Sequence, residues 1–337
     1  RARSRWVVAG KLARRGECLC IDAQLVDGAT GALCWAERYQ GESSALSGLE
    51  EQLVSRIATT LVGQLDQAHT RGALAKPSRD HTAHDRVLRA RHRLALMTQA
   101  DILEARASLL QALELHPGSA AVHTWLAETY YCEAQASWSP DPRSAAEQVL
   151  EHGQRAVELD GMDSLAHLSV AWGYLMLRES SELAAAQARH ALELNPNDYY
   201  TLCFISVLRL CSGDVDGALA SSAAALKRSP LTPSSCLVTR GFAHYLKEEY
   251  LEALEAFGGI HRPRPEVHAG VAACYAQLGR TAEAQLAART LCSDSVAKSL
   301  TLGGPEAWRS HFRRSLPLYD TRCLNQLLDG LRRAGLP

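Results

Sequence analysis

The hydrophobic residues near the start of the chain alternate with polar ones. Residues 6–10 form a short apolar run, and segments 18–26 and 33–39 each alternate with a period of two. This spacing places Ile21 and Leu25 on one face of the first alternating segment, and Leu33 and Trp35 on one face of the second. Turn residues separate the segments. The pattern predicts three strands joined as a meander.

From residue 44 the apolar spacing changes to every third or fourth position. That spacing predicts an amphipathic helix that can cover one face of the sheet. Its apolar residues are Leu46, Leu49, Leu53, Ile57, Leu61 and Leu65. Residues 72–85 then lose the period and contain Pro77, which is typical of a linker. We therefore expect a small α/β domain at 1–71 and a linker at 72–85.

Beyond residue 86 one short motif recurs. It occupies residues 112–117, 156–160, 191–196 and 225–230, and Pro196 and Pro230 are 34 residues apart. A period of 34 residues is that of the tetratricopeptide repeat (TPR), in which each repeat is a pair of helices. One pair cannot bury its apolar face alone, so neighbouring pairs must stack. The sequence predicts a mainly α chain whose TPR-type α-α superhelix, a solenoid of about six helix pairs, covers 86–300.

Two segments depart from the regular repeat. The second repeat, at about 120–161, is longer by ten residues, and we place the insertion near 137–143, which holds Pro140 and Pro142. The last segment, 301–337, has leucines at helical spacing from Leu324 to Leu331 and is expected to cap the array.

The first domain resembles a known family. Residues 8–14, 21–27, 30–31 and 33–39 are similar to the second half of the TolB-like domain of bacterial signalling proteins. The resemblance implies a truncated TolB-like domain before the repeats, in a regulatory segment. In that family the effector at the amino terminus is commonly a class III adenylate or guanylate cyclase domain or a winged-helix DNA-binding domain. The chain starts at Arg1 without an initiator Met, so we expect any such domain upstream.

Charge and cysteine content bear on the partner and the compartment. Lys and Arg number 36 against 37 Asp and Glu, so no net field attracts nucleic acid or an anionic membrane. No apolar run of about 18 residues could span a bilayer. The cysteines lack a C-x-x-C pair and are expected to be free thiols, which favours the cytoplasm; a membrane span before residue 1 would instead place the chain in the periplasm. The ten cysteines are residues 18, 20, 34, 132, 203, 211, 236, 274, 292 and 323.

Sequence signatures of catalysis are absent. The chain contains no G-x-x-x-x-G-K-[ST], no G-x-G-x-x-G after a strand, no H-E-x-x-H and no G-x-S-x-G. His81 and His84 are the nearest approach to a metal motif, but a third ligand on a rigid element is missing. We expect no catalytic residue, no metal and no cofactor in this chain.

The inner surface of such a solenoid is lined by the first helix of each pair. Aromatic groups on that surface are suited to anchor an extended peptide or a helix. By spacing, the partner-binding groove is expected to contain Tyr131, Met176, Tyr200, Cys203, Val207, Phe242 and Tyr245. Chaperone-type TPR domains hold a carboxyl terminus with Lys and Asn. The corresponding positions here, which include Glu128, supply no Asn, and this argues against that ligand.

Three functional hypotheses follow. The first is a non-catalytic interaction and regulatory scaffold of a bacterial signalling protein, which binds a protein partner, a peptide or its own effector domain through the groove. The second is the regulatory C-terminal region of a class III cyclase. The third is a small-ligand sensor of a transcriptional regulator. None of them requires direct binding of nucleic acid by this chain.

Overall fold

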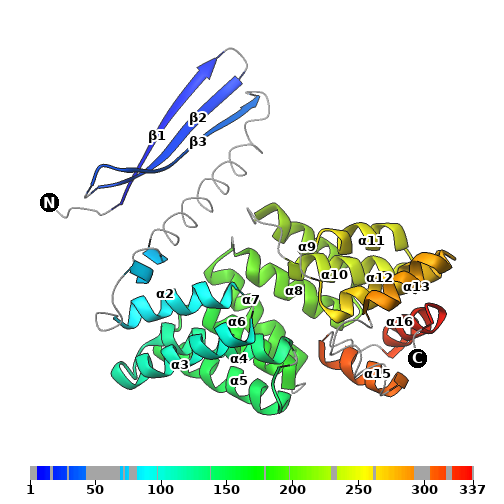
Figure 1. Cartoon of the computed structure of the whole chain (residues 1–337). Coiled ribbons are helices and arrows are strands. Elements are labelled where there is room, and N and C mark those ends of the chain that lie inside the picture. The colour runs from blue at the N-terminus through cyan, green and yellow to red at the C-terminus, as the bar shows by residue number, and fades with distance from the viewer. Residues whose placement is uncertain are drawn as a thin grey trace. The chain divides into compact units, whose positions relative to one another are not determined.

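The protein is described by a computed structural model (Figure 1). The described residues are 6–15, 18–28, 30–42, 69–70, 73–75, 82–96, 98–136, 138–177, 180–196, 198–228, 234–260, 263–291, 304–315 and 321–335. The chain divides into two compact units, Arg1–Arg89 and Ala90–Pro337.

The first unit contains the three predicted strands. They are β1 (Trp6–Arg15), β2 (Cys18–Asp27) and β3 (Leu33–Glu42), paired antiparallel in the order β1-β2-β3. Gly31 adopts φ 71° in the β2–β3 turn, where its N–H donates to the carbonyl of Asp27. Ala23 and Leu25 are buried and belong to one face of β2, as its alternation requires. The helix predicted at 44–65 lies outside the described residues.

The second unit is an α-α solenoid, which confirms the predicted fold class. Each helix between residues 99 and 291 packs on the next helix along the chain (Figure 1). These helices are α3 (Gln99–Leu115), α4 (Ala120–Gln135), α5 (Pro142–Leu159), α6 (Ser164–Leu177), α7 (Ser181–Leu194), α8 (Tyr199–Cys211), α9 (Val215–Arg228), α10 (Ser234–Leu246), α11 (Tyr250–Gly258), α12 (Pro265–Gln277) and α13 (Thr281–Leu291). A further helix, α2 (Ala83–Leu94), begins in the first unit and ends in the second.

Small side chains allow these helices to approach closely. The second helix of each pair buries at least two alanines, among them Ala184, Ala188 and Ala191 of α7. Polar caps fix where helices begin: Asp141 accepts the N–H groups of Arg143 and Ser144 at the start of α5. The buried alanines thus set how closely the helices pack, and the capping residues set where helices begin.

The longer second repeat extends its helices as well as its loop. α4 has 16 residues and α5 has 18, whereas α6 and α7 have 14 each. The connection between α4 and α5 covers residues 136–141. Of the segment predicted as an insertion, Pro142 and Arg143 already belong to α5, because Pro is well suited to the first helical position.

The observed helices define where the linker ends and where the capping segment begins. α2 begins at Ala83, within the segment predicted as a linker, and residues 73–75 are also helical. At the other end α15 (Gly304–Ser315) and α16 (Thr321–Arg333) follow the last pair, and α16 packs on α12. Trp308 and Phe312 of α15 and Leu324 to Leu331 of α16 join the hydrophobic core of the last pairs. No helix in the described ranges is long and apolar enough to cross a membrane.

Candidate functional site

Two side-chain contacts join segments of the second unit that are far apart in the chain. The hydroxyl of Tyr200 on α8 donates to Oε1 of Glu128 on α4 at 3.1 Å, although the pair formed by α6 and α7 lies between them in the chain. Arg264, before α12, donates to Oε1 of Gln135 at the end of α4 at 3.2 Å. We call the surface formed by Glu128, Tyr131, Gln135, Tyr200 and Arg264 the inner face.

Four of the seven predicted groove residues gather on one core cluster. They are half-buried and pack over buried residues that include Trp172 and Phe204. These four are Tyr131, Met176, Tyr200 and Val207. The two tyrosines are brought together although they belong to different repeats, and each lies within electrostatic range of Glu128.

The other three predicted groove residues are buried. Phe242 is 1% exposed and packs edge-to-face on Phe257, with ring centroids 5.1 Å apart. Tyr245 is fully buried, and its hydroxyl donates to the carbonyl of Gln326 on the capping helix α16. Cys203 is 3% exposed. The spacing argument did not include the capping helix, which covers the end of the array, so it placed Tyr245 on an open surface.

Glu128 was not predicted as a site residue. It lies in an apolar stretch of α4, and a carboxylate in such a stretch is the signal that could have identified it. Burial raises the pKa of Glu128, while hydrogen bonds from Tyr200 and from the thiol of Cys132 oppose that shift. In turn, the negative charge of Glu128, together with burial, raises the pKa of Tyr200 well above its usual range.

A largely buried ion pair connects α3 and α4. Nη2 of Arg106 on α3 lies 2.5 Å from Oε2 of Glu133, and both side chains are 13% exposed. The same guanidinium donates to the hydroxyl and the carbonyl of Thr129 and lies 3.9 Å from the ring centroid of Tyr130. These contacts fix the orientation of α4 and therefore of the residues it contributes to the inner face.

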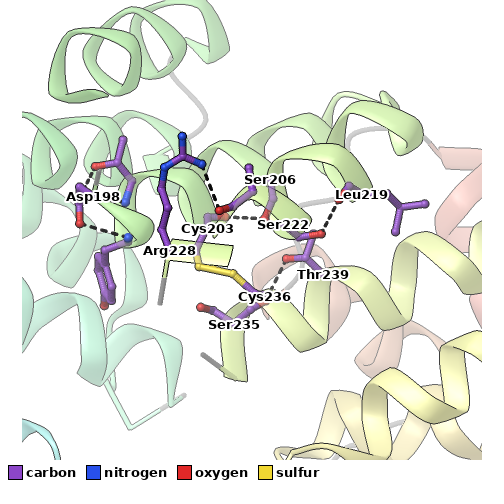
Figure 2. The surroundings of a disulfide bond; sticks show 12 residues. Asp198, Cys203, Ser206, Leu219, Ser222, Arg228, Ser235, Cys236 and Thr239 are labelled. Atoms are coloured by element: carbon purple, nitrogen blue, oxygen red, sulfur yellow. Dashed lines mark hydrogen bonds between the residues drawn. A yellow bond between two sulfur atoms is a disulfide. The ribbon is translucent and has the colours of Figure 1, made fainter. Parts of the chain in front are cut away.

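The expectation of free thiols is wrong for one pair of cysteines. Cys203 of α8 and Cys236 of α10 form a disulfide, with their Cα atoms 5.4 Å apart (Figure 2). They are 33 positions apart, close to one repeat period, so they occupy neighbouring places on successive first helices. Repeat geometry thus brings together cysteines that are distant in sequence. The disulfide removes the argument that favoured a reducing compartment.

Four other cysteines whose side chains are described form no disulfide: Cys20, Cys132, Cys211 and Cys274. Burial raises the pKa of Cys274 to about 12 and that of Cys132 well above its usual range. Buried thiols with raised pKa values are poor nucleophiles.

Histidines pair across the array without forming a metal cluster. The Nδ1 atoms of His123 and His152 are 3.1 Å apart, and the ring of His167 lies 4.6 Å from that of His190. Within the described part of the chain, no three His, Cys, Asp or Glu side chains are grouped so that they could hold a metal ion. His81 lies outside the described residues.

Comparison with known proteins gives one curated relative. The chain is 28% identical over 183 residues, 53% of its length, to a protein of Rhizobium meliloti (strain 1021) named "Putative adenylate cyclase 3". The match spans 30% of that relative. No protein-family model matches the chain.

Solved structures share the fold. The human IFIT1 dimer with m7Gppp-AAAA is similar with a TM-score of 0.56 and 16% identity, over 83% of this chain and 66% of that one. The Cut9 and Hcn1 hetero-tetramer of the APC/C is similar with a TM-score of 0.51 and 15% identity, over 73% of this chain and 48% of that one. At these identities the likeness concerns the fold alone: a superhelix of stacked helix pairs, of the type found in TPR proteins.

Proposed function

We propose that this chain is a non-catalytic interaction and regulatory scaffold of a bacterial signalling protein. It binds a peptide, a protein partner or its own effector domain through the inner face. One observation carries the proposal: Tyr131 and Tyr200 are brought together, partly buried, on helices held in place by packing. Aromatic side chains fixed on a concave surface are typical anchors of bound peptides. The TPR-type fold, common to interaction scaffolds, supports the same function.

A peptide library tests this function. A displayed library of random peptides, each long enough to cross several helix pairs, is selected on the whole chain. Enriched peptides are expected to lose about tenfold or more in affinity for the variant Tyr131→Ala plus Tyr200→Ala, an effect of the size expected from two anchors. The control is Leu251→Ala plus Leu286→Ala, which removes side chains that are 62% and 65% exposed on α11 and α13. Equal loss in both variants, or unchanged binding by the tyrosine variant when it is folded, contradicts the proposal.

The curated relative supports a second candidate. If the full protein carries a class III cyclase domain, this chain is its regulatory region and the inner face contacts that domain or a signalling partner. Sequencing the gene upstream of the codon for Arg1 identifies the effector domain. Cyclase activity of the full protein is then expected to change when Tyr131 and Tyr200 are both replaced. If the cyclase activity of this variant equals that of the wild type under every condition assayed, the regulatory role is rejected.

A third candidate is a small-ligand sensor in which the apolar part of the inner face binds a metabolite. A thermal-shift screen of metabolites tests it, because a ligand bound only by the folded state raises the unfolding temperature. A screen in which no compound stabilises the chain counts against this candidate.

A further inference from the structure

Glu128 is an acidic group of the inner face without a cationic partner. Its Oε1 accepts the hydroxyl of Tyr200 at 3.1 Å and lies 3.8 Å from the thiol sulfur of Cys132, and neither donor carries a positive charge. Within the described ranges, no nitrogen of Lys, Arg or His lies within 4.0 Å of its carboxylate. Buried carboxylates in proteins are nearly always paired, so an unpaired one on a binding surface indicates a partner of opposite charge.

Two other acidic residues near the inner face, Glu133 and Glu266, each form an ion pair with an arginine. Glu133 is paired with Arg106 at 2.5 Å. Glu266 is paired with Arg264, whose Nε lies 2.7 Å from its Oε1. Arg264 is also within electrostatic range of Tyr131 and Cys132. It is not the counter-ion of Glu128, because its guanidinium is directed to Glu266 and Gln135.

Two aromatic rings lie near the Glu128 carboxylate. Tyr200 donates to it directly, and Tyr131 is one helical turn away on the same helix. The ring of Tyr131 packs on Trp172 with centroids 4.6 Å apart, and Trp172 packs in turn on Phe204 at 4.4 Å. The rings are therefore held by the core. Aromatic faces attract cations, and the attraction is stronger where water is partly excluded.

We infer that Glu128, Tyr131 and Tyr200 form a subsite for the cationic side chain of a Lys or Arg residue in a peptide bound to the inner face. The carboxylate supplies the opposite charge and the two rings contact the aliphatic stem and the cation. The inference rests on the proposed function, because it presumes a peptide on this face. It also specifies the partner: a basic residue is required, and a free carboxyl terminus at this position is repelled by Glu128.

Small cationic probes test the subsite without a known partner. The probes are the N-acetyl methylamides of lysine and arginine, and the norleucine compound is the neutral control of similar length. Side-chain carboxyl ¹³C signals of glutamate and ring signals of tyrosine are followed by NMR at neutral pH. Saturable shifts of the signals of Glu128 and Tyr200 are expected with both cations and not with norleucine. Equal shifts with norleucine, or no shift with either cation, overturn the inference.

Matched variants assign the effect to the carboxylate. Glu128→Gln keeps the shape and is expected to weaken lysine probe binding about tenfold or more. Glu158→Gln makes the same charge change on α5, the second helix of its pair. The side chain of Glu158 is 64% exposed, and this variant is expected to bind the probe as the wild type does. If Glu128→Gln does not fold, Tyr200→Phe and Tyr200→Leu replace it, since only the second removes the ring. Unchanged binding by a folded Glu128→Gln variant, or equal binding by both Tyr200 variants, contradicts the subsite.

The peptide library separates this inference from the proposed function. If selected peptides bind the inner face and are enriched in Lys or Arg, and Glu128→Gln removes that enrichment, both stand. Selected peptides that bind the inner face without basic residues leave the proposed function standing and overturn the subsite. Cationic probes that bind while no peptide is selected show that the three side chains bind a cation, but they contradict the peptide-binding function and a peptide residue as the occupant.

Discussion

Nη1 of Arg264 lies 3.2 Å from Oε1 of Gln135, although the two residues are 129 positions apart. Gln135 is the last residue of α4 and Arg264 precedes α12, so the contact joins helix pairs that are separated by three others. In a simple solenoid each repeat contacts only its neighbours. This bond crosses the inner face and therefore resists straightening of the array.

The contribution of that bond is measurable by a double-mutant cycle. Arg264→Ala, Gln135→Ala and the double variant are unfolded in urea. The coupling free energy is expected to be about 0.5–1.5 kcal/mol, the usual net value of one hydrogen bond. The cycle isolates this pair even though Arg264 also pairs with Glu266. A coupling indistinguishable from zero means that the bond is not formed in solution.

The ion pair between Arg106 and Glu133 is expected to be sensitive to the loss of one partner. Arg106→Met leaves the carboxylate of Glu133 buried without its cation, and should lower the free energy of unfolding by about 3–5 kcal/mol. The control is Arg143→Met, because Arg143 and Glu147 form an exposed pair that contributes about 0–1 kcal/mol. Urea unfolding of both variants measures the two losses in free energy of unfolding. Similar losses in the two variants contradict the assignment of a buried pair.

The fold was predictable because each repeat packs on its neighbours in the same way. The 34-residue period and the alanines at fixed intervals, such as Ala188 and Ala191, specify stacked helix pairs without any long-range information. The strands were predictable from alternation, as Leu25 shows. Local patterns determine local structure, and in a solenoid nearly all packing is between neighbours.

The candidate site was only partly predictable because it depends on curvature. Spacing placed Tyr131 and Tyr200 on the first helices, but the approach of Tyr200 to Glu128 and Tyr131 of α4 depends on how far successive pairs rotate. The burial of Tyr245 by the capping helix α16 and the disulfide between Cys203 and Cys236 are likewise contacts between distant segments. Such contacts leave no periodic signal in a single sequence.

Gly173 is required for the close crossing of α5 and α6. A Cβ atom at this position would lie 2.7 Å from Cβ and 2.8 Å from Cα of Leu150, so the two helices would have to separate. Gly173→Ala is expected to lower the free energy of unfolding by about 1–3 kcal/mol. Gly258→Ala is the control with the opposite sign: a Cβ there meets nothing within 4 Å, and reduced chain entropy should stabilise the fold by about 0.4–1 kcal/mol. Destabilisation by both, or by neither, contradicts the close crossing.

The disulfide is expected to stabilise the centre of the solenoid. Cross-linking Cys203 and Cys236 restricts the unfolded chain, and loss of the bond should lower the free energy of unfolding by about 2–4 kcal/mol. The variant Cys203→Ala plus Cys236→Ala is compared with the wild type, each with and without dithiothreitol. The reductant should lower the unfolding temperature of the wild type only. Mass spectrometry of the alkylated, unreduced protein checks the pairing, and labelling of both cysteines in fresh oxidised protein contradicts it.

The pair formed by His123 and His152 is expected to make stability fall in mild acid. Burial lowers the pKa of both imidazoles, and the neighbouring His123 lowers that of His152 further. Glu151 opposes the shift in both residues, and Arg155 and Arg106 reinforce it. The unfolded chain therefore binds these protons at a higher pH than the folded one, near the ordinary histidine pKa of about 6.5. The stabilisation is fully present above that pH and is lost as the pH falls below it.

Urea unfolding between about pH 5 and pH 7.5, the range that brackets the ordinary histidine pKa, measures this dependence. His152→Gln removes one of the two coupled protons and is expected to flatten the slope of stability against pH. His92→Gln serves as the control, because His92 is exposed on α2, whereas the pair is formed by α4 and α5. The carboxylates of Glu249 and Glu283 contribute at lower pH, because hydrogen bonds from His244 and Arg280 hold their pKa values below the ordinary ones. A slope that is the same in His152→Gln as in the wild type shows that the buried imidazole pair does not govern acid sensitivity.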